Sequence, residues 1–150
     1  MTPSIEDARR KLQSDNADEQ RAGVALVEQL HAAGDALAAY AIGTWFLHGS
    51  HGYPRAPEKA APYLQYAAER RAPEAAYDLA TLIEEDRLGA RPRRDAFGYY
   101  VVAAAMGDRD AIEEVARCFY WGIGTFRNKA AAERLHDLLS APTAGQLAAE

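Results

Sequence analysis

Apolar and small residues recur along this chain in three blocks that share one pattern. The blocks begin at Gly34, Arg71 and Gly107, so that successive blocks start 37 and 36 residues apart. In each block a small residue is followed by an aliphatic–small pair and then by a bulky apolar residue, at spacings of four, one and three that share one helix face. The positions are Ala38, Ile42, Gly43 and Phe46; Ala75, Leu79, Ala80 and Ile83; and Ala111, Val115, Ala116 and Phe119.

A further apolar segment in each block predicts a second helix. The three segments span residues 57–71, 93–107 and 127–141. In the third, Leu135, Leu138 and Leu139 form an i, i+3, i+4 stripe with polar residues opposite, as expected for a terminal repeat whose outer face is solvated. Helix pairs that repeat at this period stack their apolar faces into a continuous core.

The two ends of the chain fit the same architecture less closely. Residues 5–13 and 17–33 predict a shorter helix pair that ends at Gly34, and a short helix or a frayed tail is expected after Pro142. We therefore predict an all-α solenoid of about four antiparallel helix pairs in one domain spanning 1–150. Its expected units are an atypical pair at 1–33, repeats at 34–70, 71–106 and 107–141, and a tail at 142–150.

These blocks resemble the Sel1-like repeat family, a relative of the tetratricopeptide repeats. The resemblance covers residues 34–141 clearly and 1–33 loosely. The first block matches the family pattern at Gly34, Asp35, Ala38, Tyr40, Ile42, Gly43, Phe46, Gly49, Lys59, Ala60, Tyr63 and Leu64, and the third at Gly107, Asp108, Ala111, Val115, Phe119, Gly122, Gly124, Lys129 and Ala130. The second block has Arg71 and Asp86 where the pattern has glycines.

The resemblance implies a scaffold for contact between proteins, which the family uses in many unrelated pathways. Some secreted relatives are rich in cysteine, and a weak β-lactamase activity has been associated with them. This chain has one cysteine, Cys118, and its first residues show no apolar run behind a basic end, so neither property is carried over. Because Cys118 lies on an apolar helix, we predict a buried structural thiol.

Composition narrows the classes of partner. The formal net charge is −5 and the pI is about 5.4, whereas a general nucleic-acid binder carries a basic balance. No stretch approaches the roughly 18 apolar residues that suggest a membrane span. We expect a cytoplasmic protein without a cofactor, which binds neither nucleic acid nor membrane and is a monomer or a weak homo-oligomer.

One segment, GIGTFRNKA at 122–130, has the glycine content of a phosphate-binding loop. Such a loop follows a strand and carries GxGxxG or GxxxxGK[ST], and this segment has neither. By repeat register it is equivalent to residues 49–60 and 86–96, which join the two helices of a pair. We therefore predict a turn whose glycines end a helix.

Other groups of ionisable residues are interpreted as structural features rather than as reactive sites. His48 and His51 have a spacing that suits a metal on one helix, but Gly49 between them ends the helix, so no metal site is predicted. The acidic run 84–86 ends a helix, where carboxylates oppose the macrodipole. The arginine-rich segment 91–95 follows it, and its arginines pair either with that run or with a partner.

Partner contacts are expected on the first helix of each pair, because these helices line the concave surface in solenoids of the tetratricopeptide type. By register the positions are Tyr40, Thr44, Leu47 and His48; Tyr77, Thr81, Glu84 and Glu85; and Glu113, Arg117, Tyr120 and Trp121. Possible rim residues are Tyr53, Arg91, Arg93, Arg94, Phe126 and Arg127. Tyr, Trp and Arg are frequent interface anchors, although Tyr40 and Tyr77 also suit packing in the family pattern. Phe119, Tyr120 and Trp121 cannot all face the core, because successive helical residues point in different directions.

The expected function is a non-catalytic adaptor that holds a protein or peptide in its concave groove. An alternative is an immunity-type inhibitor that neutralises one dedicated bacterial enzyme or toxin, because the acidic charge suits a basic target. Less favoured readings are a hydrolase that uses Glu84, Glu85 or His48, and a structural role in a homo-oligomer.

Overall fold

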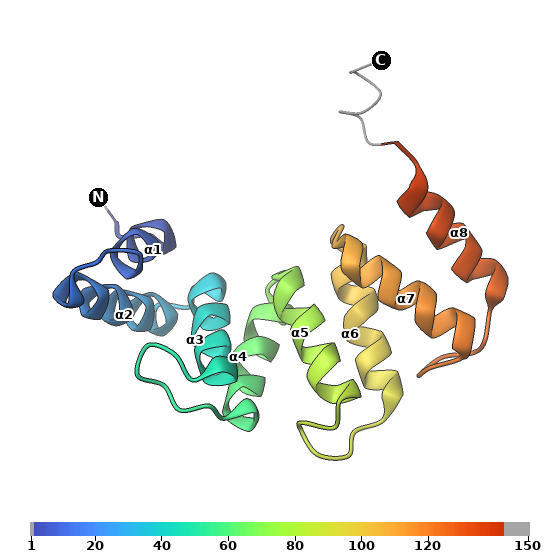
Figure 1. Ribbon diagram of the computed structural model, residues 1–150, viewed down its shortest axis with the longest axis horizontal. Coiled ribbons are helices and arrows are strands. Elements are labelled where there is room, and N and C mark those ends of the chain that lie inside the picture. Colours follow the sequence, from blue (N-terminus) through green and yellow to red (C-terminus); the bar gives the residue numbers. More distant parts are fainter. Residues whose placement is uncertain (1, 143–150) are drawn as a thin grey trace.

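The computed structural model describes residues 2–142, and over that range the chain is helical with no strand. Within residues 2–142, eight helices follow one another along an arc (Figure 1). They are α1 (Ile5–Leu12), α2 (Ala17–Ala32), α3 (Ala36–His48), α4 (Pro57–Glu69), α5 (Pro73–Glu84), α6 (Arg93–Ala105), α7 (Arg109–Trp121) and α8 (Lys129–Ser140). The prediction of an all-α solenoid is confirmed.

The helices pack in chain order, and the closest packing joins them into pairs. These pairs are α1 with α2, α3 with α4, α5 with α6 and α7 with α8. The count of about four pairs is therefore confirmed. No helix in residues 2–142 is long and apolar enough to cross a membrane.

Aspartates begin, and glycines end, the first helices of the first and third repeats. The carboxylates of Asp35 and Asp108 accept hydrogen bonds from backbone N–H groups three residues further on, at 2.8 and 2.9 Å. Gly49 and Gly122 end these helices in the left-handed conformation, with φ of 68° and 71°. The GIGTFRNKA segment thus begins with a helix-ending glycine, which confirms the turn interpretation.

The second repeat keeps the same backbone without the glycines. Arg71 has a φ of 70° where the other repeats have Gly34 and Gly107, and Asp86 has a φ of 57° at the end of α5. A left-handed conformation costs an L-residue roughly 1–2 kcal/mol. The repeat geometry therefore imposes a strained backbone on two residues of the second repeat.

Small residues bring the two helices of a pair close together. A Cβ added to Gly43 of α3 would lie 2.8 Å from a methyl group of Leu64 in α4. Ala80 and Ala116, at the equivalent positions of α5 and α7, are fully buried. The absence of a side chain at Gly43 therefore lets α3 and α4 approach closely.

The two ends of the arc differ in how they close the core. The N-terminal pair contributes Ile5 and Val27 to a second apolar cluster that also holds Trp45 of α3. At the other end, Ala132 is the one buried residue of α8. Leu138 is 58% exposed, because no later helix of the described chain covers it. The outer face of α8 is therefore less polar than expected. The helix considered after Pro142 lies outside the described residues.

Candidate functional site

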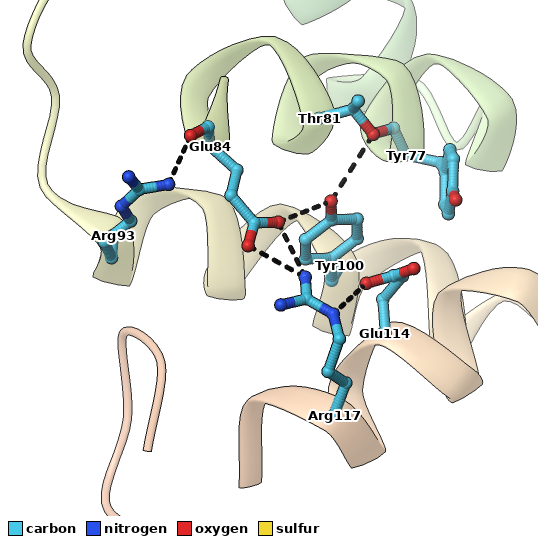
Figure 2. A network of polar contacts seen from close by, with 7 residues as sticks. All are labelled: Tyr77, Thr81, Glu84, Arg93, Tyr100, Glu114 and Arg117. Carbon is cyan, nitrogen blue, oxygen red and sulfur yellow. Dashed lines mark hydrogen bonds and ion pairs between the residues drawn. The ribbon is translucent and has the colours of Figure 1, made fainter. Parts of the chain in front are cut away.

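Side chains from α5, α6 and α7 converge in a network of polar contacts that spans two repeats (Figure 2). Glu84 is the last residue of α5 and Arg117 lies in α7. The network borders an open pocket of about 500 Å³. The pocket is lined by Tyr77, Thr81, Glu84, Glu85, Arg93, Tyr100, Glu114 and Arg117.

Glu84 is the centre of this network. Nη2 of Arg117 donates to both of its carboxylate oxygens, at 2.9 and 2.7 Å, and the Tyr100 hydroxyl donates to one of them at 3.0 Å. The Arg93 guanidinium also donates to the backbone carbonyl of Glu84. Burial alone would raise the pKa of the Glu84 carboxyl, but the hydrogen bonds from Arg117 and Tyr100 outweigh it and hold the pKa below its usual value. Glu84 is therefore an ionised acceptor rather than a proton donor.

Arg117 is held on two sides by carboxylates. Its Nε donates to Glu114 at 2.7 Å, one turn earlier on α7, while its Nη2 reaches Glu84 on α5. Burial would lower the pKa of Arg117, but the hydrogen bonds to these two carboxylates raise it further above its usual value. The guanidinium therefore clamps α5 to α7.

Tyr100 and Tyr77 form the apolar floor beneath the charged groups. Tyr100 is buried, its ring centroid lies 5.6 Å from that of Tyr77, and its hydroxyl lies 3.4 Å from the hydroxyl of Thr81. Burial raises the pKa of Tyr100 well above its usual value. Tyr77 is half-buried, so its ring serves both the packing of the repeats and the wall of the pocket.

Further carboxylates lie on the surface between this pocket and α3. The Tyr40 hydroxyl donates to Asp78 at 3.0 Å and so joins α3 to α5. Burial raises the pKa of the Asp78 carboxyl, against the effect of that hydrogen bond. Burial also raises the pKa of Tyr77, and nearby carboxylates add to the shift, namely those of Glu114, Asp110, Asp108 and Asp78. Carboxylates from α5 and α7 thus lie around Tyr77.

Aromatic side chains extend into solvent at the end of α7. Trp121 is 64% exposed and Phe126, in the following turn, is 91% exposed. Tyr120 is 37% exposed, and its ring packs against Trp121 with a centroid distance of 4.8 Å and lies 5.1 Å from the Lys129 ammonium, while Arg127 Nε donates to its backbone carbonyl at 3.2 Å. Phe119 packs on Phe97 instead. The expectation that these three consecutive aromatic residues do not all face the core is confirmed.

The other predicted site residues lie apart from this network or on its edge. Thr44 donates to a backbone carbonyl of its own helix at 2.7 Å, and Leu47 is buried. Tyr53 packs on Trp45 and Phe46 and donates to Glu28 at 2.5 Å. Those with exposed side chains are His48, Glu85, Glu113, Arg94 and Arg127, and Arg93 of the network is exposed as well.

The arginine-rich turn pairs in part with the acidic run. Arg93 lies 3.8 Å from Asp86, and Arg87 lies 3.6 Å from Glu85. Arg91 pairs instead with Asp95 at 3.2 Å. Of the two alternatives left open by the sequence, pairing with the acidic run is confirmed for Arg93, whereas Arg94 makes no ion pair with any residue in 2–142 and pairing with a partner stays a prediction.

Three members of the site were missed from the sequence: Asp78, Glu114 and Tyr100. Asp78 and Glu114 each follow a predicted position by one residue, so the same repeat register would have found them. Tyr100 lies on a second helix, and only the three-dimensional packing shows that its hydroxyl reaches the surface formed by the first helices.

The site contains no evident reactive group. Cys118 is buried, and burial raises the pKa of its thiol to about 11, as expected for a structural cysteine. Within residues 2–142 no three His, Cys, Asp or Glu side chains gather in a way that would hold a metal ion.

Solved structures with a similar fold are Sel1-type repeat proteins. A Sel1 repeat protein from Oxalobacter formigenes aligns with a TM-score of 0.70 and 22% identity, over 82% of this chain and 92% of its own. A protective antigen of uropathogenic Escherichia coli strains, which displays an SLR fold, gives a TM-score of 0.74 and 17% identity, over 93% of this chain and 33% of its own. Cysteine-rich protein B of Helicobacter pylori gives a TM-score of 0.57 and 16% identity, over 99% and 98%.

The chain therefore has the helical repeat fold of Sel1-like proteins, and the fold that the sequence resemblance implies is confirmed. No family model and no curated protein matches the chain. Identities at this level establish the architecture, so the function has to be argued from the side chains.

Proposed function

We propose that this protein is a non-catalytic scaffold that binds a segment of another protein along the surface of α3, α5 and α7. The observation that carries the proposal is the exposure of Trp121 and Phe126 beside Arg127. Burying a side chain of this size is worth about 1.5–3 kcal/mol. Large aromatic residues next to arginine are frequent anchors at interfaces between proteins.

The polar network supports the same proposal by fixing the shape of this surface. The contacts of Arg117 with Glu84 and of Tyr40 with Asp78 join α3, α5 and α7 across repeats. A surface whose side chains are already held in place loses little conformational entropy on binding. The network therefore acts as a rigid support, and the aromatic residues at its end act as the anchor.

Charge defines the chemistry of the segment that fits. The carboxylates around Tyr77 favour a segment with basic residues in its middle part. Trp121 and Phe126 favour an apolar residue at the end of the segment that reaches α7. The proposed ligand is thus an extended or helical protein segment that carries both features.

The test is affinity capture from the native cells with three forms of the protein, followed by mass spectrometry. Trp121→Ala combined with Phe126→Ala should lose the captured protein, and Tyr120→Ala combined with Trp121→Ala should weaken its capture. Leu138→Ala, which removes an exposed apolar side chain on α8, is the control and should retain it. Equal recovery by all forms, with the helical fold intact, would refute the anchor.

A narrower form of the proposal is an immunity-type inhibitor of one dedicated enzyme or toxin. The carboxylates around Tyr77 favour it, because a surface that carries them suits a basic target. In that case the captured protein is a basic enzyme, and an equimolar amount of this chain abolishes its activity. A captured enzyme whose activity does not change would exclude this form and leave the scaffold.

A further inference from the structure

Positive charge lies next to the exposed aromatic residues, in the turn between α7 and α8 and at the start of α8. Nε of Arg127 donates to the backbone carbonyl of Tyr120 at 3.2 Å, and the Lys129 ammonium lies 5.1 Å from the Tyr120 ring centroid. The Tyr120 ring packs edge-on against Trp121, with a centroid distance of 4.8 Å. Two cations and two aromatic rings thus lie together, and the exposed Phe126 directly precedes Arg127 in the chain.

These two cations have no carboxylate partner of their own. Arg127 and Lys129 are exposed, and neither makes an ion pair with any residue of the described chain. On α7, Glu114 is already bonded to Arg117 at 2.7 Å. On α8, Glu133 follows Lys129 by four residues and is exposed, so it offsets at most one of the two charges.

The neighbouring turn before α6 adds no negative charge to this end of the molecule. A Cβ added to Gly124 would lie 2.6 Å from the carbonyl carbon of Arg93, so the turn between α7 and α8 touches the first turn of α6. The carboxylates around that contact are each paired with an arginine: Glu85 with Arg87 at 3.6 Å, Asp86 with Arg93 at 3.8 Å and Asp95 with Arg91 at 3.2 Å. Because Arg94 makes no ion pair with any residue in 2–142, an excess of positive charge remains.

The backbone of the turn between α7 and α8 is held at several points. The N–H of Ile123 donates to the carbonyl of Cys118 at 2.9 Å, and the N–H of Asn128 donates to the carbonyl of Phe119 at 2.7 Å. Gly124 lies against α6 between these two bonds, with a φ of 66°. A turn fixed to α7 and α6 in this way presents its side chains with little further loss of entropy on binding.

The charge of the surface therefore changes along α7. The carboxylates of Asp108, Asp110 and Glu114 lie around Tyr77 at the first half of this helix, whereas the cations lie at its other end. A nucleic-acid strand carries negative charge along its whole length, so it would also meet these carboxylates. A protein segment can instead place a negative charge at one point and positive charges at another.

We propose that the end of the surface formed by Arg127 and Lys129 binds a carboxylate of the partner segment, from an aspartate or glutamate directly beside the apolar residue that contacts Trp121 and Phe126. This inference rests on the proposed function and adds an acidic residue to the ligand. The segment then has basic residues over Tyr77 and an acidic residue at its apolar end. Because like charges brought together are unfavourable, this pattern fixes the register in which the segment lies.

Selection from a library of random peptides displayed on phage tests the inference on the full chain. The enriched peptides should carry an aspartate or glutamate directly beside an apolar residue. Arg127→Glu combined with Lys129→Glu should lower the affinity of the strongest such peptide at least about tenfold, because two attractions become repulsions. Selection on this variant should enrich lysine or arginine beside the apolar residue instead.

Arg55→Glu combined with Lys59→Glu is the matched control in the equivalent turn of the first repeat. A Cβ added to Gly49 would lie 3.1 Å from the Cβ of Arg55, just as one added to Gly122 would lie 3.4 Å from that of Arg127. Arg55 and Lys59 are exposed and make no ion pair with any other described residue. This control should leave the peptide affinity within about twofold of the original. Circular dichroism confirms that each variant is folded.

The outcomes separate this inference from the proposed function. Enriched peptides without an acidic residue beside the apolar one would overturn the inference and leave the proposed function standing. The same holds if Arg127→Glu combined with Lys129→Glu leaves the affinity within about twofold of the original. If no peptide is enriched, or if Trp121→Ala combined with Phe126→Ala enriches the same peptides, both are overturned.

Two further probes identify a different class of anionic ligand. Phosphatidylglycerol vesicles and a single-stranded oligonucleotide are measured against the original protein and against Arg127→Glu combined with Lys129→Glu. Neither probe should bind the original protein more tightly than the strongest enriched peptide does. Tighter binding of either probe that this variant abolishes would assign the cations to a membrane or a nucleic acid and would overturn the inference.

Discussion

Replacing Arg117 with methionine removes the ion pair that joins the second and third repeats. The side chains of Arg117 and Glu84 are 35% and 20% exposed, so their contact lies between a surface ion pair and a buried one. Exposed pairs contribute about 0.2–1 kcal/mol, and hydrogen bonds to charged groups about 1.5–3 kcal/mol. Two hydrogen bonds at this intermediate burial predict a coupling energy of about 1–1.5 kcal/mol.

Arg117→Met alone should lower the free energy of unfolding by about 2 kcal/mol. This loss exceeds the coupling energy, because Glu84 and Glu114 both lose their cation. For a chain of this size that cost corresponds to a fall in Tm of about 4–8 °C. The assay is a double-mutant cycle with Arg117→Met, Glu84→Gln and the combination, measured by urea unfolding. Arg134→Met, at an exposed position of α8, is the control for loss of an arginine.

The pH dependence of this difference gives a second readout. The pKa of Glu84 in the folded protein lies below its ordinary value of 4.5. A lowered folded-state pKa adds stability above the unfolded-state pKa, and this stability is lost as the pH falls through the folded-state value. The difference between the original protein and Arg117→Met should therefore shrink below about pH 4.5. A coupling energy under about 0.3 kcal/mol, or a difference that does not change with pH, would refute the assigned role of the ion pair.

Three further substitutions test the backbone and the packing. Gly43→Leu should lower the free energy of unfolding by about 1–3 kcal/mol in urea titrations, because even its Cβ would lie 2.8 Å from a methyl group of Leu64. Arg71→Gly should raise it by about 0.5–1 kcal/mol, since relief of the left-handed strain exceeds the added entropy of the unfolded chain; an unchanged or lower value would contradict that reasoning. Gly98→Ala should raise Tm by about 2–4 °C in calorimetry, because alanine favours the helix by about 1 kcal/mol and its methyl group meets no other atom.

The helices could be predicted closely because the apolar spacing of the sequence directly reflects the helical period. The segments expected at 93–107 and 127–141 correspond to α6 at Arg93–Ala105 and α8 at Lys129–Ser140. Comparison among the repeats also identified Gly122 as the end of a helix. The same comparison did not reveal that Arg71 keeps the backbone of a glycine, because the residue type gives no sign of a positive φ.

The candidate site could be predicted only in part. Register placed Glu84 and Arg117 on the same surface, but the contact of Arg117 Nη2 with both oxygens of Glu84 depends on how far α7 is displaced from α5 in the stack. Tyr100 reaches the site from a different helix, and Tyr53 folds back onto Trp45 through an irregular turn. Such contacts depend on the relative placement of helices and turns, which spacing along the chain does not determine.

Photo-cross-linking at the end of α7 tests the central proposal most directly. A benzoylphenylalanine replaces Trp121 in one form of the protein and Phe126 in a second, with replacement of the exposed Leu138 on α8 as the control. Irradiation in the native cells should give one discrete protein adduct, the same for Trp121 and Phe126 and absent for Leu138. Adducts that are absent at all three positions, or equal at all three, would contradict a partner-binding role for this surface.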